Sequence, residues 1–208
     1  MAYDLEEQEQ LDEFKAWWNK HGKQVSSIVL LAVLAYAGWQ GYHFWIAKKS
    51  TEASNIYQTL ITSEPAKLEN IKTQANQLTQ DYSVTPYAGR AAVFLAKQQY
   101  EAKDIDGAKQ QLQWAVEHAK ESSVQSIAAL QLAGIYYENK DYETAKKTLN
   151  NIQDQGYLGL KDNLLGDILL AEGKTDDAKK AFAEALKNLD RQGRLYQLTN
   201  QKLESLGA

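Results

Sequence analysis

The chain has 208 residues, a formal net charge of −4 and no cysteine. Without cysteine it forms no disulfide, thiol nucleophile or cysteine-ligated metal site. Its mild acidity, with no block of Lys or Arg, argues against nucleic-acid binding, because phosphate contacts need clustered basic side chains.

Residues 1–24 form a short acidic segment that precedes one long apolar run, residues 25–47. The run, VSSIVLLAVLAYAGWQGYHFWIA, contains no Asp, Glu, Lys or Arg. About 20 such residues span the hydrocarbon core of a bilayer as a helix. Aromatic residues stand near both ends of the run, as in the belts at membrane interfaces: Trp17, Trp18, Trp39, Tyr42, Phe44 and Trp45. The sequence therefore predicts a single transmembrane helix at 25–47.

A cleaved signal peptide is the alternative, because Ala35-Tyr36-Ala37 has the A-x-A pattern of a cleavage site. The long acidic leader is unlike the short, positive leader of a signal peptide, and this favours a retained anchor. Three lysines precede the run and two follow it. The positive-inside rule thus slightly favours a cytoplasmic N-terminus and a large domain outside. Ala37 and Gly41 form a small-xxx-small pair, which indicates either packing against another membrane helix or plain exposure to lipid.

Residues 48–208 are rich in Ala, Leu, Gln and Lys and show no alternating strand pattern, so the predicted fold class is all-α. Apolar residues at helical spacing predict a degenerate hairpin at 50–83, with Pro65 near the start of its second helix. Leucines near the C-terminus predict a last helix at 194–206 that caps the open end of the array.

Three segments, which begin at Leu95, Leu132 and Leu165, align without gaps. In each segment, a small residue follows the leucine directly. An alanine comes 12 residues after that small residue, and a large apolar residue comes four residues after the alanine. The small residues let two antiparallel helices pack closely, and the large ones fill the space between hairpins. These positions resemble the landmarks of tetratricopeptide repeats, although the tryptophan and proline landmarks are replaced. They predict an α-solenoid of antiparallel helix pairs, with clear repeats at about 87–119, 124–155 and 157–190.

No catalytic or metal-binding pattern stands out. The three histidines are far apart in the sequence, and neither a phosphate-binding loop motif nor H-E-x-x-H occurs. The sequence therefore predicts no enzyme, no cofactor and no metal, with a carboxylate pair on the acidic solenoid left open.

The predicted functional surface is the concave groove. In tetratricopeptide arrays the first helix of each pair lines this face, and the exposed apolar residues there favour protein binding. Alignment assigns three sets of lining residues: Arg90, Val93, Lys97 and Tyr100; Ile127, Leu130, Gly134 and Tyr137; and Leu160, Asn163, Asp167 and Leu170. The alternative is that the apolar and aromatic members of these sets pack between repeats.

The whole layout resembles the bacterial YfgM family, the ancillary subunit of the SecYEG translocon. The matching features are Phe14-x-x-Trp17-Trp18 and Asn19-Lys20-His21-Gly22-Lys23 before the run, Gly38-Trp39 within it, and Thr85-Pro86-Tyr87-Ala88 before the first clear repeat. The resemblance implies an inner-membrane protein whose repeat domain lies in the periplasm. It also implies association with the translocon and with membrane-anchored periplasmic chaperones, to which emerging chains are passed, and it implies no catalytic residues.

Two functions are consistent with these features. The first is a membrane-anchored adaptor or chaperone whose groove holds unfolded or emerging protein segments. The second is a structural or regulatory scaffold for an inner-membrane or envelope complex, without binding of client chains. Suppression of aggregation of an unfolded protein separates the two, because a scaffold need not show it.

Overall fold

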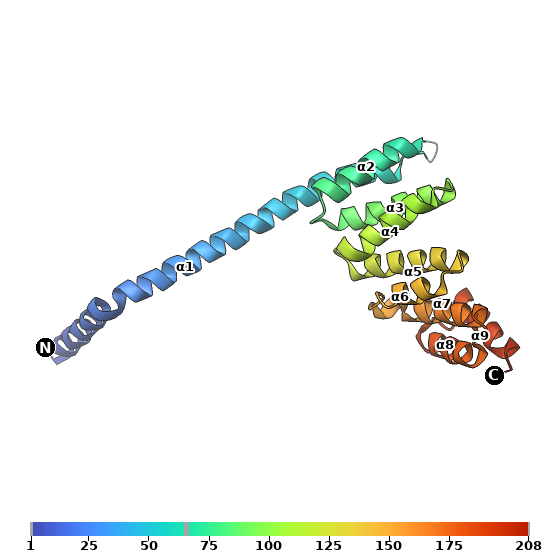
Figure 1. Cartoon of the computed structure of the whole chain (residues 1–208). Helices are drawn as coiled ribbons and strands as arrows, with labels where there is room; N and C mark the ends of the chain where they lie inside the picture. Colours follow the sequence, from blue (N-terminus) through green and yellow to red (C-terminus); the bar gives the residue numbers. More distant parts are fainter. Residues whose placement is uncertain (1, 65–66, 208) are drawn as a thin grey trace. The chain divides into compact units, whose positions relative to one another are not determined.

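The computed structural model describes residues 2–64 and 67–207, and in these ranges the regular elements are helices, with no strand (Figure 1). The all-α prediction is therefore confirmed. Pro65 lies outside the described residues. The chain divides into two compact units, one up to Lys48 and one from Lys49 onward.

Helix α1 is one continuous helix, Ala2–Ile61. The sequence predicted three separate elements here: an acidic segment, a membrane helix and the first helix of the degenerate hairpin. They form one helix because residues 2–61 contain no proline, and isolated glycines weaken a helix without breaking it. Part of α1 is long and apolar enough to cross a membrane. Its large apolar side chains are exposed, among them Leu31 at 66% and Phe44 at 75%, as expected of a lipid-facing helix.

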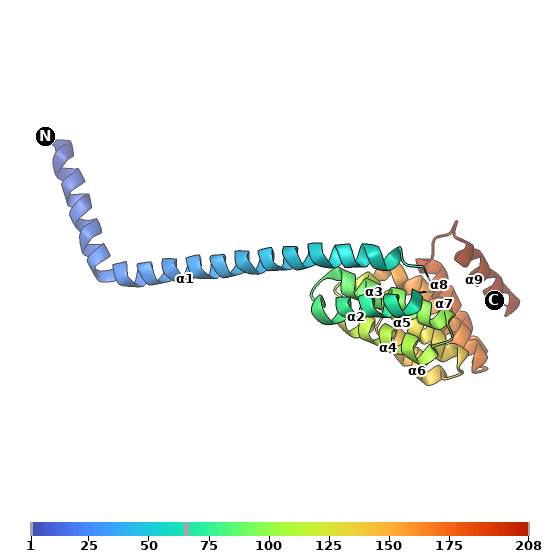
Figure 2. The ribbon, with the colours of Figure 1, turned by 90° about the horizontal axis from the view of Figure 1, so that it is seen from above.

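From Lys49 onward, the helices form consecutive hairpins that stack side by side in chain order (Figures 1 and 2). The end of α1 packs against α2 through Ala53 and Leu60. Each later odd-numbered helix up to α7 pairs with the helix that follows it. The bounds are α2 Leu68–Asp81, α3 Pro86–Glu101, α4 Ile105–His118, α5 Ser122–Glu138, α6 Tyr142–Leu149, η2 Gln155–Tyr157, α7 Leu158–Ala171, α8 Thr175–Asn188 and α9 Arg194–Ser205.

The three hairpins α3–α4, α5–α6 and α7–α8 have the same turn geometry. Equivalent positions adopt a left-handed backbone, with φ of 68° at Lys103, 60° at Lys140 and 79° at Gly173. Two residues later the next helix begins, and in the first two hairpins an aspartate caps it. Asp104 accepts from the Gly107 amide at 3.0 Å, and Asp141 accepts from the Thr144 amide at 3.2 Å. Such caps satisfy amides that have no partner within the helix.

The landmark residues of the repeats form the core. The small residues Ala96 and Ala133 and the alanines after each turn are almost fully buried. Gly166 takes the same place in α7, and a Cβ there would collide with the ring of the fully buried Phe182 in α8. Close approach of paired helices therefore depends on these small side chains, as the repeat pattern predicted.

An ion-pair cluster joins α6 to the end of α7. Lys146 Nζ lies 2.8 Å from Glu172 and 2.7 Å from Glu143, and Lys174 Nζ lies 3.1 Å from Glu172. The Glu172 side chain is only 13% exposed. The hydrogen bond from Lys146 is the largest of the effects that hold the Glu172 pKa below its ordinary value of 4.5.

This cluster predicts an acid-sensitive contribution to stability. A carboxylate whose pKa is lower in the folded chain stabilises it above the unfolded pKa, and this stabilisation is lost as pH falls toward the folded value. We expect Glu172→Gln to lower the free energy of unfolding at pH 7, and the deficit to shrink below about pH 4, where unfolded glutamate is protonated. Urea titrations of the full chain in detergent at both pH values measure this. Glu69→Gln, at an 85% exposed side chain, is the control. An equal deficit at both pH values would contradict the prediction.

Candidate protein-binding groove

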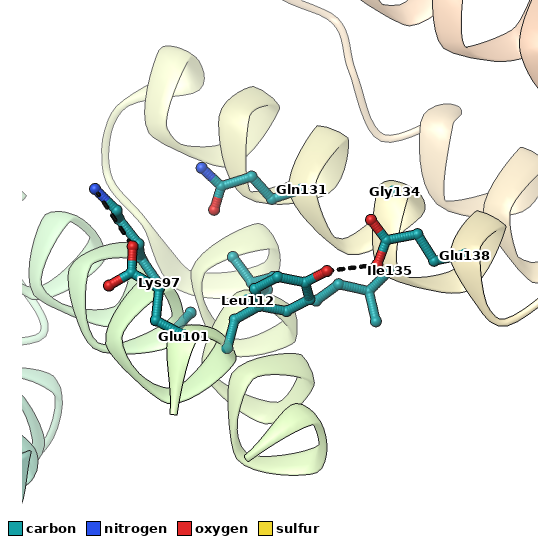
Figure 3. Close-up of a pocket in the computed structure, with 9 residues that line it drawn as sticks. Lys97, Glu101, Leu112, Gln131, Gly134, Ile135 and Glu138 are labelled. Carbon is teal, nitrogen blue, oxygen red and sulfur yellow. Dashed lines mark hydrogen bonds and ion pairs between the residues drawn. The ribbon is translucent and has the colours of Figure 1, made fainter. Parts of the chain in front are cut away.

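Two adjoining hollows lie between α3 and α5, the first helices of two neighbouring hairpins. The first, here named the Gly134 pocket, has a volume of about 450 Å³ (Figure 3). Its lining is Ala96, Lys97, Tyr100, Glu101, Leu112, Gln131, Gly134, Ile135 and Glu138. The second, the Arg90 pocket, has a volume of about 310 Å³ and is lined by Tyr57, Arg90, Val93, Phe94, Lys97, Val124, Ile127 and Gln131. Because Lys97 and Gln131 line both, the two pockets form one α3–α5 groove.

The Gly134 pocket has an apolar floor and a polar rim. Ala96, Leu112 and Ile135 form the floor and are at most 6% exposed. Lys97 and Glu101 stand on the α3 side of the pocket, and Gln131 and Glu138 stand on the α5 side (Figure 3). A Cβ at Gly134 would meet no atom within 4 Å, so the missing side chain leaves part of the pocket open. An apolar floor with a few polar groups around it is the usual composition of a binding site.

Two polar contacts connect α3 to α5, one near each end of the groove. Arg90 makes a bidentate ion pair with Glu121, at 2.6 and 2.7 Å. At the other end, the Tyr100 hydroxyl donates to a Glu138 carboxylate oxygen at 2.5 Å. The hydrogen bond to Glu121 raises the pKa of Arg90. The hydrogen bond to Glu138 raises the pKa of Tyr100, so its hydroxyl stays protonated and keeps donating. The two contacts thereby link the helices at both ends of the groove.

All four predicted lining residues of the first repeat lie in this groove. Arg90, Val93 and Lys97 line the Arg90 pocket, together with Ile127 of the second repeat. Lys97, Tyr100 and Gly134 line the Gly134 pocket. Val93 and Tyr100 also pack against the core between α3, α4 and α5, so they take part in both of the arrangements that the sequence left open.

Leu130 and Tyr137 lie elsewhere. Both pack against the core between the second and third hairpins, and the Tyr137 ring lies 6.1 Å from that of Tyr142. On α5 the groove is instead lined by Ile127, Gln131, Gly134 and Glu138, which follow one another at steps of four, three and four residues. This spacing keeps the four residues on one face of a helix. The repeat alignment missed Gln131 and Glu138 because it transferred the α3 positions unchanged.

Two of the four predicted residues of the third repeat, Asn163 and Asp167, contact α9. The Thr199 hydroxyl donates to Asn163 at 2.9 Å, and Lys202 Nζ lies 2.6 Å from Asp167. Neither Asn163 nor Asp167 lines either pocket of the α3–α5 groove. The candidate binding surface therefore lies on the first two clear repeats, and the same face of the third is partly covered by the last helix.

Ala37 and Gly41 lie on α1, far from the groove in the sequence. They line a shallow hollow on the surface of that helix together with Gln40 and Phe44. A Cβ at Gly41 would meet no atom within 4 Å, so this face offers room for a close approach. Among the described residues, no group of three or more His, Cys, Asp or Glu side chains could hold a metal ion.

Gly134 and Gly166 predict opposite effects of the same substitution. Glycine inside a helix costs about 0.5–1 kcal/mol relative to alanine. Since a Cβ at Gly134 meets no other atom, Gly134→Ala should raise the free energy of unfolding by about that amount. Gly166→Ala should lower it, because its Cβ collides with Phe182. Denaturant titration of both variants measures the two signs, and destabilisation by Gly134→Ala would show that this part of α5 is packed.

Comparison with known proteins identifies the family. The family model of the tetratricopeptide repeat-like domain matches residues 15–208. A protein of Neisseria gonorrhoeae called ancillary SecYEG translocon subunit is 28% identical over 208 residues, which cover 99% of this chain and 100% of the relative. Proteins of the same name from Haemophilus influenzae and Escherichia coli are 31% identical over 185 residues and 24% identical over 200 residues. These matches cover 89% and 96% of this chain, and 91% and 96% of the relatives. The chain therefore belongs to the YfgM family of tetratricopeptide-like ancillary SecYEG translocon subunits.

Proposed function

We propose that this chain is a membrane-anchored adaptor of the SecYEG translocon whose α3–α5 groove holds segments of emerging proteins and passes them to periplasmic chaperones. The observation that carries this proposal is the groove itself, which combines an apolar floor with a rim of exposed polar side chains. Open apolar surface of this kind favours protein binding. The name of the relatives supports the translocon as the partner.

The proposed location is the inner membrane, with residues 1–24 in the cytoplasm, a span at 25–47 and the repeat domain in the periplasm. Aromatic rings cluster at both ends of the apolar run, which supports an uncleaved span. The ring centroids of Phe14 and Trp18 lie 6.1 Å apart, and those of Trp39 and His43 lie 4.6 Å apart. Such clusters suit the two membrane interfaces. Anchoring also supports the adaptor role, because it raises the concentration of the groove near the membrane.

Site-specific photocrosslinking of the full chain in cells tests this function. A photoreactive residue at Gln131, which lines both pockets, should capture a translocon component, a periplasmic chaperone or an emerging chain. The same residue at Gln110, which is exposed on α4 and lines neither pocket, is the matched control. Equal capture from the two positions, or none from either, would contradict the proposal.

The orientation and the client-binding step need separate tests. For the orientation, a reporter that is active only in the periplasm is fused after Ala208 and should show activity. A cytoplasmic C-terminus would overturn the transfer role.

For client binding, the full chain in detergent should slow the aggregation of an unfolded protein. Translocon capture without such slowing would favour the scaffold instead.

A further inference from the structure

The Gly134 pocket is lined at one position of the repeat by a residue without a side chain. In the alignment of the three repeats, Gly134 is equivalent to Lys97 and Asp167. In the third repeat, the equivalent residue Asp167 forms an ion pair with Lys202 of α9. Gly134 has no side chain to fill the space, and the pocket lies over Leu112 and Ile135 (Figure 3). The second repeat therefore offers an apolar cavity where the third has a satisfied ion pair.

The rim of this pocket carries an excess of negative charge. Glu101 and Glu138 contribute two carboxylates, and Lys97 contributes one ammonium group. Lys97 lies 3.9 Å from Glu101, and both side chains are more than half exposed, so this ion pair is weak. The Tyr100 hydroxyl neutralises no charge but holds the Glu138 carboxylate at the rim. A positively charged group on a bound ligand would therefore lie near two carboxylates: that of Glu138, which Tyr100 holds in place, and that of Glu101, which is only weakly paired with Lys97.

The size of the pocket favours a peptide over a folded domain. Its volume of about 450 Å³ lies toward the lower end of the range of about 300–1,000 Å³ for small-ligand sites. A stable interface between folded proteins buries roughly 800 Å² on each partner. The pocket has room for one large side chain of an extended peptide segment, with the neighbouring residues of that segment lying along the rim.

We propose that the Gly134 pocket binds one large apolar side chain of an unfolded segment, next to a Lys or Arg of that segment that pairs with Glu101 and Glu138. This inference rests on the proposed function, since it specifies which segments of emerging chains the groove selects. Sequences with an acidic residue beside the apolar anchor are disfavoured, because like charges at the rim repel them.

The experiment uses the full chain in detergent and three fluorescent peptides. One is a flexible Gly/Ser peptide with a single adjacent Phe-Lys pair, the second replaces Phe by Ser, and the third replaces Lys by Glu. Fluorescence anisotropy should show the tightest binding for the Phe-Lys peptide. Loss of the anchor should weaken binding by at least about 30-fold, the lower limit of a hot-spot effect. Equal binding of the three peptides, or preference for the Phe-Glu peptide, would overturn the inference.

Four variants assign the binding to this pocket. Gly134→Leu should fill the cavity and abolish the preference for Phe, whereas Gly134→Ala leaves most of it open and should keep that preference. Gln110→Leu adds the same apolar side chain outside the groove and should bind as the unmodified chain does. The double variant Glu101→Gln/Glu138→Gln should lose the preference for Lys over Glu. Circular dichroism and denaturant titration establish that each variant is folded. Unchanged binding by folded Gly134→Leu would overturn the assignment.

Failure of this inference is distinguishable from failure of the proposed function. If emerging chains are captured from Gln131 in cells but capture does not change in Gly134→Leu, the adaptor role stands and the pocket assignment is wrong. If the Phe-Lys peptide binds as expected but no emerging chain or chaperone is captured, the pocket is a peptide site with another physiological partner.

Discussion

Replacing Phe182 by alanine is expected to lower the free energy of unfolding of the repeat domain by about 3–5 kcal/mol, the usual cost of removing a buried aromatic side chain. Phe182 is fully buried, Gly166 of α7 packs against its ring, and Lys202 Nζ of α9 lies 5.4 Å from the ring centroid. The side chain therefore joins the last three helices. The measurement is a urea titration of the full chain in detergent.

The damage should be local, because each repeat of a solenoid contacts only its neighbours. Hydrogen exchange should show that amides in α7, α8 and α9 lose most of their protection, while those in α3 and α4 keep it. Leu198→Ala, at a side chain that is 42% exposed, is the control and should cost less than about 1 kcal/mol. Uniform loss of protection across all helices would contradict the description of independent hairpins.

Replacing Leu34 by arginine should largely prevent stable insertion of α1 into a membrane. Leu34 lies near the middle of the apolar run and is 59% exposed. Leucine favours insertion at the centre of a helix by about 0.5 kcal/mol, and arginine opposes it by about 3 kcal/mol. Alkaline extraction of membranes, followed by immunoblotting, should move the variant from the membrane fraction to the soluble fraction.

Leu34→Ile is the matched control, because it changes side-chain shape without adding charge. It should remain in the membrane fraction. If the arginine variant also remained there, attachment would depend on contacts other than this helix. Mass spectrometry of the extracted protein adds a further test, since an N-terminus at Gly38 would mean that the run is cleaved after Ala37.

The hairpins could be predicted from the sequence because their packing depends on residue size at fixed spacing. Ala96, Ala133 and Gly166 recur at equivalent positions, and each allows one helix to approach its partner. Phe182 was likewise identified by its distance from the alanine after the turn. Such local patterns can be read from a single sequence because each hairpin pairs residues that are close in the chain, as Gly166 and Phe182 are.

Three features could not be read from spacing. The continuity of α1 across the end of the apolar run depends on the absence of a helix breaker, which hydropathy alone does not show. The orientation of Leu130 and Tyr137 depends on competition between two cores that flank α5. The contact of Asp167 with Lys202 joins residues 35 positions apart, and nothing in the repeat pattern specifies where a terminal helix rests.

The two contacts that connect α3 to α5 have a consequence for the entropy cost of binding. Because Arg90–Glu121 and Tyr100–Glu138 hold the helices before a ligand arrives, the conformational entropy lost on binding falls almost entirely on the incoming segment. Each backbone residue that becomes ordered costs about 1–2 kcal/mol. A groove that is open in advance loses little entropy of its own, so each further residue of a segment that becomes ordered on binding offsets part of the affinity gained.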